Sequence, residues 1–375
     1  MNTGRADLVR PEAAKRWIEA LIPYLTLGNR VAPGGVMNVM LLFVPLAVMG
    51  RLFDLGAVFT FVCAALSCVP LSYRLGQATE EVGSRLGPVS GGLLNATFGN
   101  AAELIISIAA LNHGLLILVR MTIIGSILGQ LLLVLGTSLL LAGLRYRELG
   151  FSRALVQTNF TRIVIAMLVI GLPSVLVAMA PEKAEASASL LTPALCILLL
   201  LIYGFTVVFT LRRQTMDEDE EAPKWPLSKG LLLLGASTGG IVLVSELLVS
   251  SVLPFVEATN ISEVFIGLIV IPIFGNVVDH IVAISVAMKN KMDMSITISV
   301  GSASQVACLV LPVIVLSSIL MGRPLGLLFA PVKLLALGMG VLLMIPVLLD
   351  GISNWLEGAQ LLTCYGILAL VLFAL

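Results

Sequence analysis

Two acidic residues, Glu103 and Asp279, lie inside long apolar stretches of this 375-residue chain. A charged side chain at the centre of a membrane-spanning helix is costly, so such acids are rare and are usually functional. No basic residue lies near either acid in its own stretch. This pattern favours binding of cations or protons over an internal ion pair that only holds helices together.

The surroundings of the two acids repeat along the chain. Residues 98–100 (Phe-Gly-Asn) recur as residues 274–276, 176 positions later, and at the same offset Glu103 matches Asp279. Gly125-Ser126 likewise matches Gly301-Ser302. Matches between apolar residues would mean little in so apolar a chain, but a Gly-Asn pair, an acid and a Gly-Ser pair in one register indicate an internal repeat.

Polar residues on the same or the next stretch could complete a cation site around the acids. Carboxylate and amide oxygens without sulfur or imidazole suit hard divalent cations, and Ca²⁺ accepts six to eight oxygens in a flexible shell. Mg²⁺ fits less well because it keeps its waters, and the oxygen ligands disfavour soft metals. The predicted metal ligands are Glu103, Asp279, Asn100, Asn276, Gln130, Gln305, Ser126 and Ser302.

The same pair of acids suggests a counter-ion. Two like charges in a medium of low dielectric constant cannot both stay ionised without a partner, so the empty site is expected to bind protons that a divalent cation then displaces. Glu103 and Asp279 are thus the predicted proton-coupled residues. His280 could tune the site, and Glu81 and Glu257, which also match at the 176 offset, could line its entrances. Ordinary interfacial acids remain an equal interpretation of Glu81 and Glu257.

The elements that must position these residues are membrane helices. Apolar residues make up 58% of the chain, charged residues only 12%, and the mean hydropathy is +1.07. The long apolar runs do not alternate, which favours a helical bundle over a barrel. The sequence therefore predicts an all-α polytopic membrane protein with eleven spans, at 35–50, 55–72, 89–112, 116–143, 160–181, 190–211, 228–252, 261–288, 295–321, 327–349 and 355–375.

The predicted organisation is one extra helix followed by two five-helix repeats. An odd number of spans in each repeat forces opposite orientations in the membrane, as in many secondary transporters whose sites lie at the midplane between the repeats. The predicted boundaries are an N-terminal cytoplasmic segment (1–34), the first helix (35–54), the first repeat (55–211), an acidic cytoplasmic linker (212–229) and the second repeat (230–375).

The distribution of basic residues predicts the orientation. With the N-terminus in the cytoplasm, 17 of the 22 Lys and Arg residues fall on the inner side and 5 on the outer side. This bias favours a cytoplasmic N-terminus and a C-terminus outside. The lipid bilayer is the expected partner and nucleic acid is not. The short loops favour a prokaryotic plasma (inner) membrane over a vacuolar membrane, and the oligomeric state stays open.

The motifs around the acids resemble those of a known family. Residues 91–105 (GGLLNATFGNAAELI) are similar to the first signature of the calcium/proton antiporters of the cation/calcium exchanger superfamily, and residues 275–280 (GNVVDH) with 301–305 (GSASQ) are similar to the second. The resemblance implies that Glu103 and its counterpart bind Ca²⁺ and protons alternately, helped by Asn100, Asn276, Gln130 and Gln305. It also implies that the first span and its repeat-related partner slide to alternate access.

Two positions depart from the family pattern, and the first of them bears on ion preference. The family usually has Glu where this chain has Asp279, and it more often has Thr at the position of Ala102. A carboxylate that is one methylene shorter reaches less far, so affinity or ion choice is expected to differ.

The sequence thus favours Ca²⁺/H⁺ antiport, with Ca²⁺ and H⁺ as transported ions and no permanently bound cofactor. Exchange of Mn²⁺ or Na⁺ with H⁺, or of Na⁺ with Ca²⁺, remains the alternative on the same scaffold. An intramembrane enzyme is disfavoured because the chain has no HExxH motif and its two histidines, His113 and His280, are far apart. The absence of a phosphate-binding loop argues against ATP as the energy source.

Overall fold

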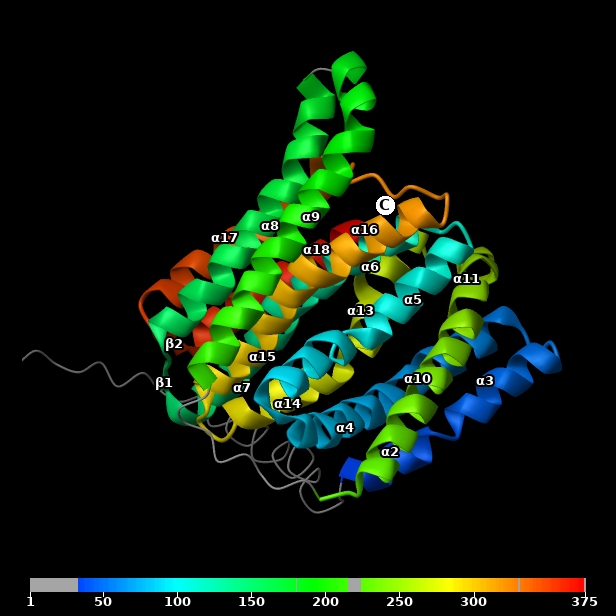
Figure 1. The fold of residues 1–375 in the computed structure, drawn as a ribbon, viewed down its shortest axis with the longest axis horizontal. Helices are drawn as coiled ribbons and strands as arrows, with labels where there is room; N and C mark the ends of the chain where they lie inside the picture. The colour runs from blue at the N-terminus through cyan, green and yellow to red at the C-terminus, as the bar shows by residue number, and fades with distance from the viewer. Residues whose placement is uncertain (1–32, 180, 215–223, 330, 374–375) are drawn as a thin grey trace, which may run out of the picture.

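The computed structural model describes residues 33–179, 181–214, 224–329 and 331–373, and nearly all of them are helical (Figure 1). Most of the N-terminal segment and the acidic run 217–221 of the linker lie outside the described residues. The helices of the first half are α2 (Pro33–Met40), α3 (Phe43–Leu52), α4 (Ala57–Phe98), α5 (Ala101–Asn112), α6 (Leu116–Leu128), the π-helix η1 (Gly129–Val134), α7 (Leu135–Tyr146), α8 (Arg153–Met179) and α9 (Pro181–Gln214).

The second half is helical in a similar way. Its elements are α10 (Leu227–Ser250), α11 (Val252–Thr259), α12 (Glu263–Phe265), the π-helix η2 (Ile266–Val270), α13 (Ile271–Gly275), α14 (Val277–Ala287), α15 (Met292–Gln305), the π-helix η3 (Val306–Val310), α16 (Leu311–Leu320), α17 (Pro331–Leu349) and α18 (Trp355–Phe373). Two short strands, β1 (Glu148–Gly150) and β2 (Ile352–Asn354), pair antiparallel and tie the two halves together.

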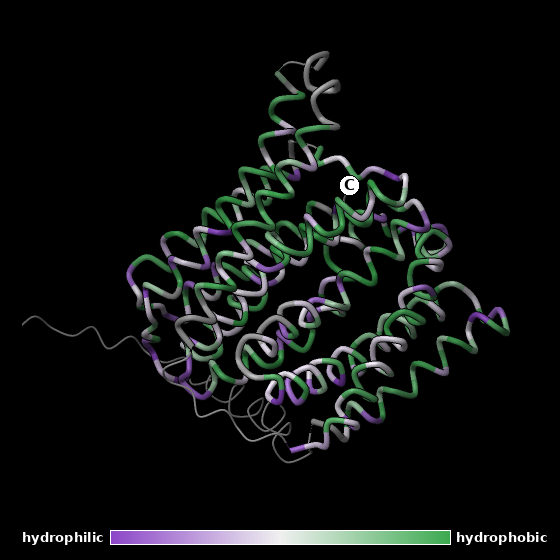
Figure 2. The backbone as a smooth tube through the Cα atoms, in the orientation of Figure 1, coloured by the Kyte–Doolittle hydropathy of each residue, from purple (hydrophilic) through white to green (hydrophobic). Residues whose placement is uncertain are grey.

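The lengths and compositions of these helices suit a membrane. Among the described residues, seven helices are long and apolar enough to cross a bilayer, or eight when the bent pair 263–275 and 277–287 counts as one span. Three shorter apolar helices accompany them, at 101–112, 333–349 and 355–371. Figure 2 shows apolar residues along the helices and hydrophilic ones mostly toward their ends. The chain is thus mostly helical with many apolar spans, while the count of eleven stays a prediction.

Two helix breaks lie at the repeated Phe-Gly-Asn motif. α4 ends at Phe98 and α5 starts at Ala101, while α13 ends at Gly275 and α14 starts at Val277. The asparagines at the breaks have similar backbone angles, with φ −114° and ψ 21° at Asn100 and φ −104° and ψ 12° at Asn276. In the second pair the two helices meet at 59°. The sequence repeat is therefore accompanied by a repeated local geometry.

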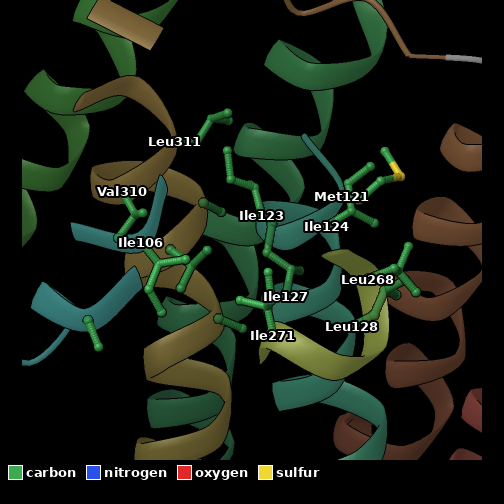
Figure 3. Close-up of a cluster of buried hydrophobic side chains, with 14 of the residues drawn as sticks. Ile106, Met121, Ile123, Ile124, Ile127, Leu128, Leu268, Ile271, Val310 and Leu311 are labelled. Atoms are coloured by element: carbon green, nitrogen blue, oxygen red, sulfur yellow. The ribbon is translucent and has the colours of Figure 1, made fainter. Parts of the chain in front are cut away.

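The core is formed by apolar side chains from both halves around α6. Ile123 and Ile127 of α6 are nearly fully buried, and they pack in one cluster with Ile106 of α5, Ile271 of α13 and Val310 of η3 (Figure 3). Because Ile106 follows the first break and Ile271 precedes the second, burial of these side chains in one cluster holds the breaks near one another.

Helices α7 and α18 pack unusually closely, and this contact gives a testable prediction. A Cβ atom at Gly358 of α18 would lie 2.3 Å from the Leu140 amide nitrogen, closer than real Cβ contacts. Gly358→Ala is therefore expected to cost about 1–3 kcal/mol of stability. Gly366→Ala, on the same helix, is the matched control because no atom lies within 4 Å of its Cβ position.

Thermal unfolding of the detergent-solubilised variants measures this difference. The melting temperature should fall for Gly358→Ala and stay near that of the wild type for Gly366→Ala. Equal melting temperatures for the two variants would contradict the packing of α7 on α18.

Candidate cation site

The two helix breaks position the two acids. Glu103 lies in the first turn of α5, and Asp279 lies in the first turn of α14. The first turn of a helix carries amide groups without intrahelical partners and the positive end of the helix dipole, which favour a negative charge there. The sequence places an acid in the first turn after each break, so each carboxylate lies near the positive end of its helix.

The polar residues that follow the breaks bond across the two halves of the chain. The Asn100 amide (Nδ2) donates to Gln305 Oε1 at 2.7 Å, and Gln130 Nε2 donates to Asp279 Oδ2 at 3.1 Å. Asn276 Nδ2 donates to Ser126 Oγ at 3.2 Å. Each of these hydrogen bonds joins one copy of the motif to the other, so six of the eight candidate ligands are paired across the two halves.

The two acids have unequal surroundings. Asp279 Oδ2 accepts a hydrogen bond from Ser302 Oγ at 2.9 Å in addition to the one from Gln130, and Asp279 as a residue is less fully buried than Glu103. Glu103 is only 5% exposed, and its charge interacts with that of Asp279. Asp279 is thus positioned by two hydrogen-bond donors, Ser302 and Gln130, whereas Glu103 is buried in the core.

One buried oxygen in this region has no hydrogen-bond partner. Gln130 is fully buried, and while its Nε2 donates to Asp279 and to Ser302 Oγ (3.2 Å), its Oε1 has no partner among the described residues. A buried amide oxygen without a partner is costly, and a cation or a water molecule would satisfy it. Within the described residues no cluster of three or more His, Cys, Asp or Glu side chains occurs. A cation here would therefore be held by two carboxylates together with amide and hydroxyl oxygens.

Three other residues singled out in the sequence lie around this region rather than in it. His280 is partly buried next to Asp279, and its ring makes no hydrogen bond within the described part of the chain. The Glu81 carboxylate accepts hydrogen bonds from the backbone amides of Lys224 (2.9 Å) and Trp225 (3.0 Å), so it fastens the end of the linker to α4. Glu257 is exposed on α11. The entrance roles of Glu81 and Glu257 stay predictions.

Sequence reasoning missed the groups that hold the far ends of the two acid-bearing helices. Arg323 Nη1 donates to the Leu111 carbonyl at 2.8 Å near the end of α5. The Tyr146 hydroxyl donates to the Met288 carbonyl at 2.9 Å just after α14. Donors at helix C-termini satisfy carbonyls that lack intrahelical partners. The sequence contains these donors, but their targets are more than a hundred residues away.

A contact between a histidine and an acid that the sequence did not suggest joins α5 to α10. His113 Nε2 lies 2.6 Å from Glu246 Oε1, which joins the end of α5 to α10. Both side chains are substantially exposed, so the pair adds little stability to the fold.

The chain is similar in sequence to known exchanger proteins. Residues 56–212 and 229–374 match the family described as sodium/calcium exchanger protein. The chain is 38% identical over 356 residues to the Ca²⁺/H⁺ antiporter of Aphanothece halophytica, covering 89% of this chain and 95% of that protein. It is also 38% identical over 342 residues to the Ca²⁺/H⁺ antiporter ChaA of Bacillus subtilis (strain 168), covering 88% of this chain and 97% of that protein.

A solved structure shows the same fold. The crystal structure of the selenium-substituted Ca²⁺/H⁺ antiporter YfkE superposes with a TM-score of 0.79 at 35% sequence identity. The match covers 91% of this chain and 99% of that one. The arrangement of helices around the two acids is therefore that of a known class of membrane transporter.

Proposed function

We propose that this chain, which belongs to the sodium/calcium exchanger protein family, exchanges Ca²⁺ for H⁺ across a membrane through one site built on Glu103 and Asp279. It is an integral membrane transporter, and its close relatives are Ca²⁺/H⁺ antiporters. Ca²⁺ and H⁺ are its transported ions. The resemblance found in the sequence alone agrees with the family to which the chain belongs.

The observation that carries this proposal is the set of hydrogen bonds between the two halves at the acids. The Gln130–Asp279 and Asn100–Gln305 bonds put the polar groups of both halves in one region lined by oxygen atoms. Two carboxylates, together with amide oxygens such as Gln130 Oε1, which has no partner in the described part of the chain, form a ligand set of the kind Ca²⁺ prefers. The ligands in this proposal are the two acids with Asn100, Asn276, Gln130, Gln305, Ser126 and Ser302.

Competition for the carboxylates couples the two ions. Two negative charges in a region shielded from water are neutralised either by protons or by one divalent cation, and both cannot bind fully at once. Ca²⁺ binding therefore releases protons, and protonation releases Ca²⁺. If the site opens to one side of the membrane at a time, this competition produces antiport.

The proposal extends to the membrane topology. Eleven spans, with one extra helix and two oppositely oriented five-helix repeats, place Glu103 and Asp279 on helices that meet near the midplane. The excess of Lys and Arg on one face supports a cytoplasmic N-terminus. The similarity to bacterial antiporters supports a prokaryotic plasma membrane over a vacuolar one.

Transport in sealed vesicles tests the function. Purified protein is reconstituted, and Ca²⁺ flux is followed under an imposed pH gradient and, separately, under an imposed Na⁺ gradient of the same size. We expect the pH gradient to drive Ca²⁺ in the direction opposite to the flow of protons. The Na⁺ gradient should have no effect on Ca²⁺ flux. Flux that followed Na⁺ and ignored pH would replace this function with Na⁺/Ca²⁺ exchange. Proton flux driven by Mn²⁺ or by Na⁺ in place of Ca²⁺ tests the two remaining alternatives.

A further inference from the structure

The two acid-bearing helices, α5 and α14, are each held at their start by a glutamine from the other half of the chain. Asn100, which caps the start of α5, donates to Gln305 at 2.7 Å. Gln130 donates to Asp279, in the first turn of α14, at 3.1 Å. Gln130 lies on the span formed by α6, η1 and α7, and Gln305 lies on the span formed by α15, η3 and α16. The start of each acid-bearing helix is therefore bonded to one long span of the opposite half.

The ends of the same two spans hold the far ends of these helices. Arg323, which follows the end of α16, donates through Nη1 to the carbonyls of Leu111 (2.8 Å) and Asn112 at the end of α5. The Tyr146 hydroxyl, at the end of α7, donates at 2.9 Å to the carbonyl of Met288, which caps α14. Each acid-bearing helix is thus bonded at both ends to a single span of the other half and its immediate continuation.

The internal repeat relates the two far ends to one another. At the 176 offset Asn112 corresponds to Met288, and the turn after each has one residue with a positive φ, +75° in the first copy and +61° in the second. The donors also come from neighbouring positions of the repeat, because Arg323 corresponds to Arg147, the residue after Tyr146. Attachment at both ends is therefore common to the two copies and is not an isolated contact.

The two far-end donors differ in strength. Arg323 is a charged guanidinium that reaches two carbonyls, whereas Tyr146 is a neutral hydroxyl that reaches one. Arg145 Nη1 lies 3.4 Å from the same Met288 carbonyl, which is long for a hydrogen bond. Hydrogen bonds from charged donors are stronger than those between neutral groups. The far end of α5 is therefore held more firmly than the far end of α14.

We propose that Arg323 and Tyr146 are positioning residues for Glu103 and Asp279, respectively. Each donor fixes the far end of an acid-bearing helix, so that the acid near its start keeps one position beside the polar groups of the other half. Without the donor the helix takes several positions, of which only one aligns the Ca²⁺ ligands, and the apparent affinity falls with the population of that position. The proposal rests on the proposed function, because it takes the two acids as Ca²⁺ ligands.

Ca²⁺ binding to purified, detergent-solubilised protein, followed by isothermal titration calorimetry, tests the role of Arg323. Arg323→Met removes the donors and keeps an unbranched side chain, and we expect the Ca²⁺ dissociation constant to rise by about tenfold or more. The contact between His113 and Glu246 still holds the end of α5, so the variant should fold. Arg323→Lys should recover most of the affinity because an ammonium group also donates to carbonyls.

A matched control removes the same charge elsewhere. Arg51→Met changes an exposed arginine on α3 that makes no hydrogen bond within the described part of the chain. Its dissociation constant should stay near that of the wild type.

Tyr146→Phe tests the second donor by removing one hydroxyl. The lost hydrogen bond is neutral and Arg145 stays near the same carbonyl, so we expect a smaller rise in the dissociation constant, of about threefold or more. Tyr365→Phe is the matched control, because the buried Tyr365 hydroxyl on α18 has no partner among the described residues. It should bind Ca²⁺ as the wild type does.

Exchange in sealed vesicles separates positioning from a general loss of activity. The Ca²⁺ concentration for half-maximal exchange should rise by the same factors in Arg323→Met and Tyr146→Phe. The maximal rate should stay within about twofold of the wild-type rate, since saturating Ca²⁺ selects the aligned position of the helix.

The outcomes separate the two proposals. Lower melting temperatures with unchanged dissociation constants in Arg323→Met and Tyr146→Phe would show that the donors only stabilise the fold, which overturns the positioning roles and leaves the exchange function intact. Equal losses of affinity in Arg323→Met and Arg51→Met would also overturn them. A wild-type protein that bound Ca²⁺ without exchanging it for H⁺ would refute the proposed function, and the binding comparison would still decide the positioning roles.

Discussion

Replacing Glu103 by Gln is expected to abolish Ca²⁺/H⁺ exchange while leaving the protein folded. The amide keeps the size of the side chain in its enclosed position, so packing against the core changes little. It removes both the negative charge that attracts Ca²⁺ and the group that takes up a proton. We expect the exchange rate to fall by more than about a hundredfold, equivalent to about 2.7 kcal/mol.

A matched control separates this effect from the general effect of removing a charge. Glu148→Gln makes the same chemical change at an exposed position on β1, outside the site, and should leave exchange near the wild-type rate. Gel-filtration profiles and melting temperatures of both variants check the fold. A folded Glu103→Gln protein that exchanged at the wild-type rate would remove Glu103 from the mechanism.

Asp279→Asn has the second largest expected effect. The carboxylate oxygen Oδ2 accepts hydrogen bonds from Ser302 and Gln130, and an amide oxygen can accept both, so the fold should survive. The lost negative charge should lower the exchange rate by more than about a hundredfold, as for Glu103→Gln. Retained exchange in Asp279→Asn would mean that a single acid suffices.

Asp279→Glu keeps the negative charge and changes only the length of the side chain, so it separates the two effects. It restores the acid that the resembled family usually carries, so exchange should persist. The longer side chain displaces the carboxylate from its position beside Ser302 and Gln130. We therefore expect the Ca²⁺ concentration for half-maximal exchange to change by about fivefold or more, together with the preference for Ca²⁺ over Mn²⁺. An unchanged concentration dependence would show that the reach of this acid does not set affinity.

The features that could be predicted from the sequence are those that local chemistry determines. Apolar runs reveal membrane helices because each must satisfy its backbone internally. The Phe-Gly-Asn repeat identifies Glu103 and Asp279 as related, and the structure has a helix break at both copies. Gln130 and Gln305, on the next span of each copy, were also predicted as sources of oxygen ligands, and the structure pairs them with Asp279 and Asn100.

The remaining features depend on contacts between distant parts of the chain. Which of the two acids is more fully buried depends on how the two halves pack, and the repeat treats both alike. The bond between Glu81 and the linker backbone, and the donation from Arg323 to the end of α5, join residues more than a hundred positions apart. No local pattern specifies such pairs.

The most direct test of a site shared by both ions is proton release from purified protein. Ca²⁺ is added to weakly buffered, detergent-solubilised wild-type protein, and the change in pH is recorded beside Ca²⁺ binding. If protons and Ca²⁺ compete for Glu103 and Asp279, Ca²⁺ binding releases protons from the wild type, and Glu103→Gln releases fewer or none. Ca²⁺ binding to the wild type without any release of protons would contradict the shared site.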